Sequence, residues 1–358
     1  MSIEFDFKKH KIDAVEQYIK IRPTYERFTS TLRDILEKVL SEKRTNIHSI
    51  EARAKDIENF GEKAVKPSEE EPSKPKYPNP LDNITDLAGL RIIAFFPRTV
   101  EKIDQIIYDQ FDVVEKIDKS EILKKEEKLG YHSVHYLIKL HSNRSDLPEY
   151  KPFHNLIAEI QVRTILQHAW AEIEHDIKYK SSITIPENIK RRFISLAGLL
   201  EIADREFQSI QDEDNKLRAS DRKLVKEGKL EDVAITPDAL KTYLDKVMGS
   251  DGRISKSSYD FDSEKLIEMG FKNLLQIDTC IKDYIDNSIV ETSIWGSRQG
   301  QLWRLQDLLL AALGDEFIKR HPWSKNGDKW ATNLFSKGLK KMKKGGVKVG
   351  KYKTELDN

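Results

Sequence analysis

Apolar residues recur every three or four positions over the first part of the chain, a spacing typical of amphipathic helices. This pattern predicts a helix over residues 14–43, which Pro23 interrupts or divides in two because proline removes a backbone donor. A further helix is predicted over residues 47–65, where four apolar side chains share one face: Ile50, Ala54, Ile57 and Phe60. The next segment, residues 66–80, is acidic and rich in proline, which indicates an exposed loop.

The pattern then changes to short apolar runs rich in β-branched and aromatic residues, which are typical of strands. Strand-like runs occur in four places, at residues 87–96, 111–117, 133–140 and 155–163. Helical spacing returns over residues 99–108 and 164–179. Because strands alternate with helices, we predict an α+β fold in which helices flank one mixed β-sheet.

The C-terminal half is predicted to be mainly helical. Apolar residues step by three and four over residues 193–210, which predicts a long helix, and a strongly charged segment follows it. Four of the five tryptophans lie beyond residue 234, and a stretch rich in lysine and glycine comes near the end. We therefore divide the chain into a first domain, a long helix or linker, a helical accessory domain and a basic tail, at residues 1–182, 183–230, 231–336 and 337–358.

Composition excludes several classes of protein. The 358 residues include 61 Lys and Arg against 60 Asp and Glu, so the net charge of +1 gives no general indication of nucleic-acid binding. No apolar run approaches the roughly 18 residues of a membrane span, and the N-terminal residues lack the pattern of a signal peptide. The single Cys280 excludes an internal disulfide and a thiolate zinc site. We expect a cytoplasmic protein without membrane contact.

Three cations form the first candidate functional group. Arg53, Lys55 and Lys63 would share one broad side of the helix predicted over residues 47–65. Guanidinium and ammonium groups bind phosphate oxygens, so this side is a candidate polyphosphate clamp. The alternative is a solvated basic face, which is the commoner role of charged residues on a helix.

Two carboxylates stand beside predicted strands. Asp86 precedes one strand by a short step and is a hard oxygen ligand of the kind that Mg²⁺ prefers; the alternative is a turn residue paired with Arg91. Alternation along the last predicted strand places Glu159, Gln161 and Arg163 on one face. That face is either exposed to solvent or lines a pocket in which the carboxylate binds a metal or activates a hydroxyl.

A third block runs from Gly130 to His135. Glycine allows a close turn, after which Tyr131 is placed to form a stacking platform on a pocket wall. The alternative is a hairpin corner in which Tyr131 and His135 pack into a core.

Together and in this order, these blocks resemble the RelA/SpoT nucleotidyl-pyrophosphokinase domain, the alarmone synthetase domain. The resemblance covers about residues 18–180 and includes a closing block, residues 169–180, that is similar to the family pattern Trp-Ala-x-x-x-His-x-x-x-Tyr-Lys. It implies a nucleotidyltransferase-like synthetase fold for the first domain. The dipeptide His175-Asp176 falls inside this block, and no His-Asp pair occurs in the first 60 residues, so we exclude a metal-dependent HD phosphohydrolase.

The resemblance also implies roles for residues that bind ATP. Arg53 and Arg91 match the two arginines that sandwich the adenine, and Lys55 and Lys63 match the phosphate-binding lysines. Asp86 matches a ligand of the Mg²⁺ cofactor.

Further roles concern catalysis and the acceptor. Glu159 matches the glutamate that joins the metal site and promotes attack by the acceptor, with Gln161 beside it. Tyr131 matches the tyrosine that stacks on the acceptor base, and His135 a nearby phosphate-contacting residue. Lys128 belongs to a basic loop that matches the family's loop for acceptor phosphates, although its spacing departs from the family pattern.

The implied reaction transfers the β,γ-pyrophosphate of ATP to the ribose 3′-hydroxyl of GDP or GTP, making (p)ppGpp and releasing AMP. One alternative is a toxin-type member that modifies the 3′-end of tRNA or an adenosine nucleotide, with the C-terminal module as regulator or antitoxin. Another is a catalytically silent nucleotide sensor, which the presence of both Asp86 and Glu159 disfavours. The sequence is compatible with a homo-oligomer and does not set the oligomeric state.

Overall fold

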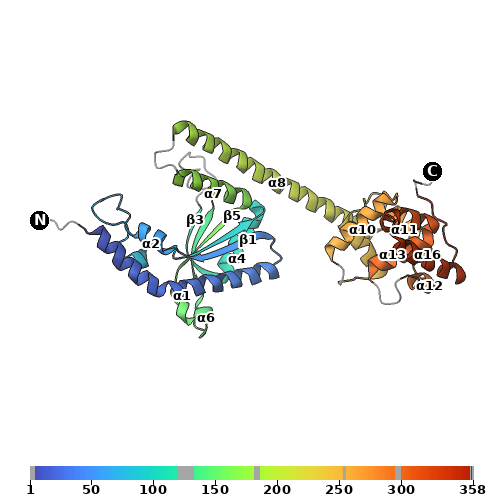
Figure 1. Ribbon diagram of the computed structural model, residues 1–358, viewed down its shortest axis with the longest axis horizontal. Coiled ribbons are helices and arrows are strands. Elements are labelled where there is room, and N and C mark those ends of the chain that lie inside the picture. The colour runs from blue at the N-terminus through green and yellow to red at the C-terminus, as the bar shows by residue number, and fades with distance from the viewer. Residues whose placement is uncertain are drawn as a thin grey trace. The chain divides into compact units, whose positions relative to one another are not determined.

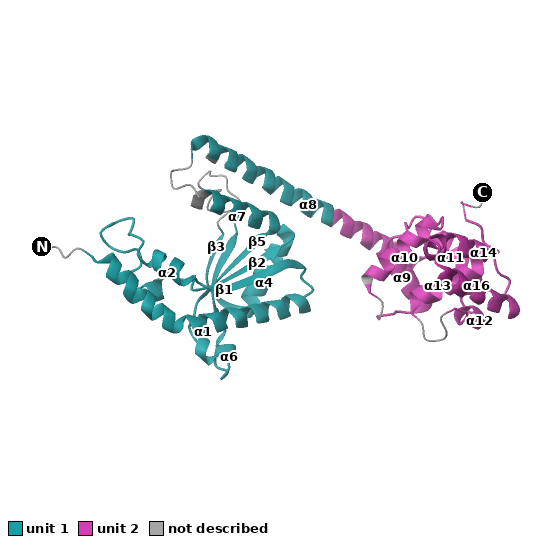
Figure 2. Cartoon of the chain, viewed as in Figure 1, with its two compact units in different colours: residues 1–211 teal, residues 212–358 magenta. Residues whose placement is uncertain are grey.

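The chain folds into two compact units, Met1–Gln211 (unit 1) and Asp212–Asn358 (unit 2), shown in Figure 2. This computed structural model describes residues 5–118, 133–180, 186–252, 255–294, 300–354 and 356. The long helix α8 (Glu187–Glu227) contributes residues to both units. No helix among the described residues has the length and apolar character needed to cross a membrane.

Unit 1 is built on a five-stranded sheet with the order β1-β2-β5-β4-β3. The strands are β1 (Ile47–Ala54), β2 (Ala88–Ala94), β3 (Phe111–Asp118), β4 (Val134–Leu140) and β5 (Ala158–Thr164). The β2–β5 pair is parallel and the other three pairs are antiparallel. The predicted mixed sheet is confirmed, and four of its strands coincide with the four apolar runs.

Helices cover both faces of this sheet (Figure 1). Besides the first part of α8, the helical elements of unit 1 are α1 (Phe7–Glu42), α2 (Ile57–Ala64), α3 (Pro80–Asn83), α4 (Pro97–Gln110), α6 (Ser142–Ser145), the 3₁₀ turn η1 (Lys151–Phe153) and α7 (Ile165–Lys180). Helices α1 and α4 share a buried apolar core with the inward side chains of β2 and β5. Helix α7 contacts the same two strands from the opposite face, the one that carries the polar residues.

The prediction of a single helix over residues 47–65 is wrong. The segment forms strand β1, which pairs with β2, and then the short helix α2. Asp56 separates the two, because its side chain caps α2 by accepting from the backbone N–H groups of Glu58 and Asn59 at 2.9 and 3.1 Å. Arg53 and Lys55 therefore lie at the end of a strand rather than on a helix with Lys63.

The expected interruption at Pro23 is also absent. Helix α1 is continuous over its 36 residues and includes this proline. A proline inside a helix costs about 3 kcal/mol or more. Burial of large side chains on both sides of the proline offsets this cost, notably of Tyr18 before it and of Phe28 and Leu32 after it.

Unit 2 is mainly helical over its described residues, as the spacing of its apolar residues predicted. Its elements are α9 (Pro237–Met248), α10 (Lys256–Glu268), α11 (Leu274–Ile281), η2 (Lys282–Tyr284), α12 (Ser288–Glu291), α13 (Gln301–Leu313), α14 (Asp315–Arg320), α15 (Pro322–Lys325) and α16 (Lys329–Lys344). Helix α13 lies in the centre, with almost all of its residues buried. The basic segment was predicted to be a tail from residue 337. Its first part instead belongs to α16, up to Lys344, and buries Leu339 and Met342 in the core.

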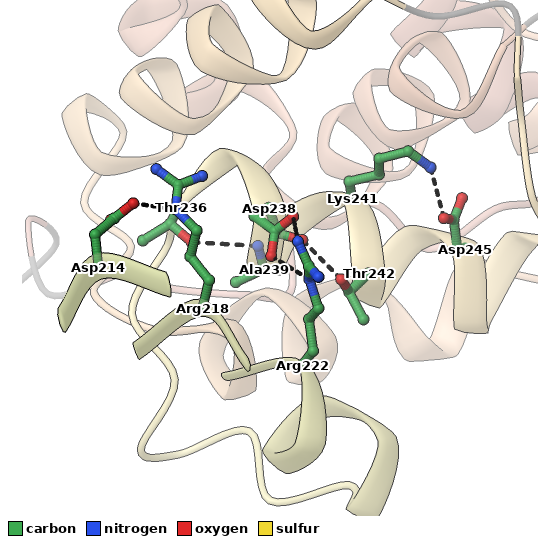
Figure 3. Close-up of polar contacts among 9 residues, drawn as sticks. All are labelled: Asp214, Arg218, Arg222, Thr236, Asp238, Ala239, Lys241, Thr242 and Asp245. Atoms are coloured by element: carbon green, nitrogen blue, oxygen red, sulfur yellow. Dashed lines mark hydrogen bonds and ion pairs between the residues drawn. The ribbon is translucent and has the colours of Figure 1, made fainter. Parts of the chain in front are cut away.

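Within unit 2, the end of α8 is tied to the start of α9 (Figure 3). The guanidinium of Arg222 donates two hydrogen bonds to the carboxylate of Asp238, at 2.6 and 2.7 Å. Asp238 lies in the first turn of α9, whose N-cap Thr236 accepts from the backbone N–H of Ala239 at 3.2 Å. A bidentate ion pair beside a capped helix start thus connects these two segments.

Candidate active site

Polar side chains cross one face of the sheet in register. Arg53 pairs with Gly89 across β1 and β2, and Glu159 pairs with Gly89 across β2 and β5. Arg91 pairs in the same way with Gln161. Because paired residues on neighbouring strands point to the same face, these strands present one continuous polar strip.

This strip and helix α2 enclose a cavity of about 520 Å³. Seven of the side chains that the sequence singled out line it: Arg53, Lys55, Lys63, Asp86, Arg91, Glu159 and Gln161. Asp86 and Glu159, which are distant in sequence, thus meet at one cavity. His135 joins them through a contact with Glu159, whereas Lys128 and Tyr131 lie outside the described residues.

Asp86 is held between two lysines. Its Oδ2 lies 2.8 Å from Nζ of Lys55 and 3.1 Å from Nζ of Lys63. Burial alone would raise the pKa of Asp86, but the hydrogen bonds and charges of the two lysines hold it below its usual value. Its other oxygen, Oδ1, is buried without a hydrogen-bond partner among the described residues. The carboxylate is therefore ionised and has one oxygen available to a further ligand.

The backbone of Lys55 is fixed from two sides. Its N–H donates to the carbonyl of Leu87 at 2.9 Å, which extends the β1–β2 pairing by one residue. Its carbonyl accepts from the hydroxyl of Tyr18 at 2.7 Å and from Nε of Arg22 at 3.2 Å, both on α1. Tyr18 is fully buried and stacks on Phe60 of α2. Helix α1 therefore sets the position from which the Lys55 side chain enters the cavity.

Glu159 is hydrogen-bonded to a histidine. Nδ1 of His135 lies 2.5 Å from Oε1 of Glu159, and Nε2 of the same ring lies 2.7 Å from the hydroxyl of Ser133. A carboxylate only accepts hydrogen bonds, so Nδ1 carries the proton in this contact. Burial and the nearby Asp86 charge would raise the pKa of Glu159, but the His135 contact keeps it below its usual value. The result is a partly buried but ionised carboxylate.

The two arginines of the cavity differ in their surroundings. Arg91 is held by carboxylates, 3.0 Å from Glu172 on α7 and 3.6 Å from Glu51 on β1. Arg53 is exposed and makes no ion pair within the described part of the chain. One guanidinium is thus positioned in advance, and the other is free to close over a bound group.

The residues fit a hard divalent cation such as Mg²⁺. Asp86 and Glu159 supply carboxylate oxygens at one cavity, and Oδ1 of Asp86 has no partner in the described structure. Across the described ranges, no three His, Cys, Asp or Glu side chains gather closely enough to hold a metal ion by themselves. This is compatible with Mg²⁺, which keeps several waters and is bound by one or two carboxylates together with substrate phosphates.

Several contributors to the site were not predicted from the sequence. Glu51 and Glu172 hold Arg91, and Tyr18 holds Lys55. The polar–apolar alternation over residues 50–54 is a signal for strand β1 that would have placed Glu51 beside Arg53. No local signal identifies Tyr18 or Glu172, because each reaches the site only through the packing of its helix.

The chain is similar to known proteins over the segment that carries this cavity. A family model described as "Region found in RelA / SpoT proteins" matches residues 52–184. This segment is a RelA/SpoT region. The resemblance predicted from the sequence blocks is thereby confirmed for this part of the chain, which runs from within β1 to just beyond α7 and includes every predicted site residue.

Two curated relatives of the RelA/SpoT region come from Bacillus subtilis (strain 168). GTP pyrophosphokinase YjbM is 28% identical over 140 residues, which is 39% of this chain and 64% of YjbM. GTP pyrophosphokinase YwaC is 27% identical over 132 residues, or 37% of this chain and 60% of YwaC. The chain therefore matches slightly less than two thirds of either relative.

A solved structure is similar over a longer stretch. The crystal structure of the small alarmone synthetase 1 from Bacillus subtilis covers 56% of this chain and 99% of its own, with a TM-score of 0.46 and 23% sequence identity.

Proposed function

We propose that unit 1 transfers the β,γ-pyrophosphate of ATP to the ribose 3′-hydroxyl of GDP or GTP, with AMP as the leaving group. The observation that carries this proposal is the meeting of Asp86 and Glu159 at one cavity that also holds the side chains of Arg53, Lys55 and Lys63. The cavity lies in a RelA/SpoT region, and two curated relatives of that region are named GTP pyrophosphokinases.

The cations of the cavity are suited to the donor nucleotide. Lys55 and Lys63 are poised to exchange part of their interaction with Asp86 for the phosphates of ATP. Arg53 and Arg91, on neighbouring strands, are placed to pack on the two faces of the adenine. In this assignment the triphosphate lies over the lysines and the base lies towards the edge strand β1.

Glu159 acts as the general base on the acceptor. Its ionised carboxylate takes the proton of the 3′-hydroxyl as the hydroxyl oxygen attacks the β-phosphorus of ATP. The new bond forms between that oxygen and the β-phosphorus, the bond to the α–β bridging oxygen breaks, and AMP leaves with the electron pair. His135 orients Glu159 and keeps it ionised between turnovers.

Asp86 and Glu159 would hold the Mg²⁺ ion, with the phosphates completing its coordination. When bound, Mg²⁺ neutralises the charge that develops on the phosphate oxygens during transfer. Gln161, which donates weakly to Glu159 at 3.4 Å, helps to keep the carboxylate facing the cavity.

The test is a transfer assay with ATP labelled at the γ-phosphate. The full chain is incubated with Mg²⁺ and, in separate reactions, with GDP, GTP, ATP or deacylated tRNA. We expect label in GDP or GTP and unlabelled AMP as the second product. Label in tRNA or in an adenosine nucleotide would replace the acceptor assignment while retaining the chemistry.

The matched control is Glu159→Gln, which keeps the size of the side chain and removes its charge. We expect this variant to bind ATP normally and to lose at least about 100-fold in transfer rate, a typical cost of removing a general base. If the wild-type chain is folded but labels none of the four acceptors, the proposal is wrong.

A further inference from the structure

Unit 2 contains a cavity of about 520 Å³ between α10, α13 and α15. Aromatic side chains form its walls: Phe261, Trp303 and Trp323. Phe261 is 44% exposed and Trp303 is 39% exposed, and the ring centroids of Trp303 and Trp323 are 6.4 Å apart. Large aromatic rings at an open cavity, rather than inside the adjacent core, provide flat surfaces on which a planar ligand can stack.

The floor of this cavity is polar. Gln306 lines it and is only 3% exposed, yet Oε1 of its amide has no hydrogen-bond partner among the described residues. Asp262 lies beside it, almost fully buried, and forms an ion pair with Lys265 one turn further along α10. Buried acceptors without partners are rare in folded proteins and indicate a missing donor. Both floor groups are hydrogen-bond acceptors.

The rim of the cavity is lined by hydroxyl groups. Ser255 lies 3.0 Å from Ser257 and 2.9 Å from Ser258, measured between their Oγ atoms. The described lining includes no Lys or Arg side chain that would complement a phosphate or carboxylate. The lining therefore does not favour an anionic group, and it suits a flat ligand part that can donate hydrogen bonds from one edge.

We propose that this cavity binds the base of a purine nucleoside. A purine offers two faces for stacking and N–H groups on one edge, which the amide oxygen of Gln306 and the carboxylate of Asp262 would accept. The ribose would lie at the serine rim, whose hydroxyls both donate and accept. The site belongs to unit 2 alone and does not depend on the activity of unit 1.

The test is equilibrium dialysis of the full chain against guanosine and, separately, adenosine. Nucleosides are used because they lack the phosphates that the lysines of unit 1 would bind. Each is compared between the wild-type chain and the variants Gln306→Leu and Trp303→Ala. Trp330→Phe is the matched control: Trp330 is exposed and does not line the cavity, and phenylalanine retains an aromatic ring beside the wall residue Trp323.

We expect at least one of the two nucleosides to bind to the wild-type chain. Its dissociation constant should rise about 10-fold in Gln306→Leu and about 10-fold or more in Trp303→Ala. The control should bind like the wild type. Tryptophan fluorescence, which reports mainly on unit 2, shows whether each variant is folded.

Two results would overturn the proposal. One is that neither nucleoside binds to the wild-type chain at millimolar concentration. The other is that binding persists unchanged in both folded cavity variants, which would assign it to unit 1. Preferential binding of a simple hexose, tested in parallel as methyl glucoside, would also contradict a purine site.

Discussion

The imidazole of His135 on β4 forms a hydrogen bond with the carboxylate of Glu159 on the neighbouring strand β5. The contact opposes two effects that act against ionisation of Glu159, namely burial and the charge of Asp86. If Glu159 is the general base that we propose, it must be ionised to accept a proton, so the histidine contact extends its working range towards lower pH.

Replacement of His135 should therefore change the pH dependence of transfer. In His135→Ala the pKa of Glu159 loses its main lowering influence, and we expect the acid limb of the kcat profile to move to higher pH. Ser133→Ala is the control, because it leaves the Nδ1 contact intact. An unchanged acid limb in His135→Ala would mean that the histidine does not act through Glu159.

Loss of one hydroxyl on α1 should weaken ATP binding at a distance. In Tyr18→Phe the carbonyl of Lys55 loses a buried hydrogen bond, so we expect the free energy of unfolding to fall by about 1 kcal/mol and the KM for ATP to rise about 5-fold. Tyr25→Phe is a matched control, because Tyr25 lies on the same helix and its hydroxyl has no hydrogen bond among the contacts described. Equal KM values in the two variants would contradict a positioning role for Tyr18.

Unit 2 should lose stability in mild acid because of one buried histidine. Burial, with a smaller contribution from the charge of Lys265, lowers the pKa of His321 to about 3. The unfolded histidine titrates near 6.5, so the folded unit binds fewer protons between these values, and its stability falls as the pH drops below 6.5. Between pH 7.5 and pH 5 we expect a loss of about 2 kcal/mol from this group.

Denaturant unfolding followed by tryptophan fluorescence measures this loss, because four of the five tryptophans lie in unit 2. His321→Asn is the control, since asparagine can still accept from the backbone N–H of Trp323 and does not titrate. The variant should be less stable at pH 7.5 but should show a shallower dependence on pH. Parallel pH curves for both proteins would exclude His321 as the source.

The start of α9 should be sensitive to its cap more than to its ion pair. Thr236→Ala removes the N-cap acceptor and is expected to cost about 1 kcal/mol of unit 2 stability. Arg222→Met removes the bidentate pair with Asp238, which is partly exposed, and should cost less than about 1 kcal/mol and less still at high salt. Unfolding curves at two salt concentrations distinguish these effects, and a larger cost for Arg222→Met would reverse the ranking.

The sequence predicted those strands whose apolar residues are contiguous. Strands β2 and β5 are buried in the middle of the sheet, so each appears as an apolar run. Strand β1 lies at the edge, and Ile50, Ala54 and Ile57 also fit the helical spacing. The segment therefore fits both the helical period and the strand period. Only its pairing with β2 decides in favour of a strand, and that pairing depends on residues far away in the sequence.

The site was predictable to a similar extent. Motif resemblance selected the side chains that line the cavity, because each motif is local in sequence. It did not reveal which neighbours hold them, such as Tyr18 for Lys55 or Glu172 for Arg91. Nor did it predict that His135 bonds to Glu159; its expected phosphate contact stays a prediction. The roles of Tyr131 and Lys128 also stay predictions, because both lie outside the described residues.

The hydrogen bonds from α1 to Lys55 determine where unit 1 can be truncated. The RelA/SpoT region begins at residue 52, so a fragment cut at that boundary would lack Tyr18, Arg22 and the first five of the eight residues of β1. It would also expose the apolar side of the sheet that α1 now covers, and such a fragment should aggregate. A shortened chain that keeps the cavity must therefore start upstream of α1, whose first turn begins at Phe7.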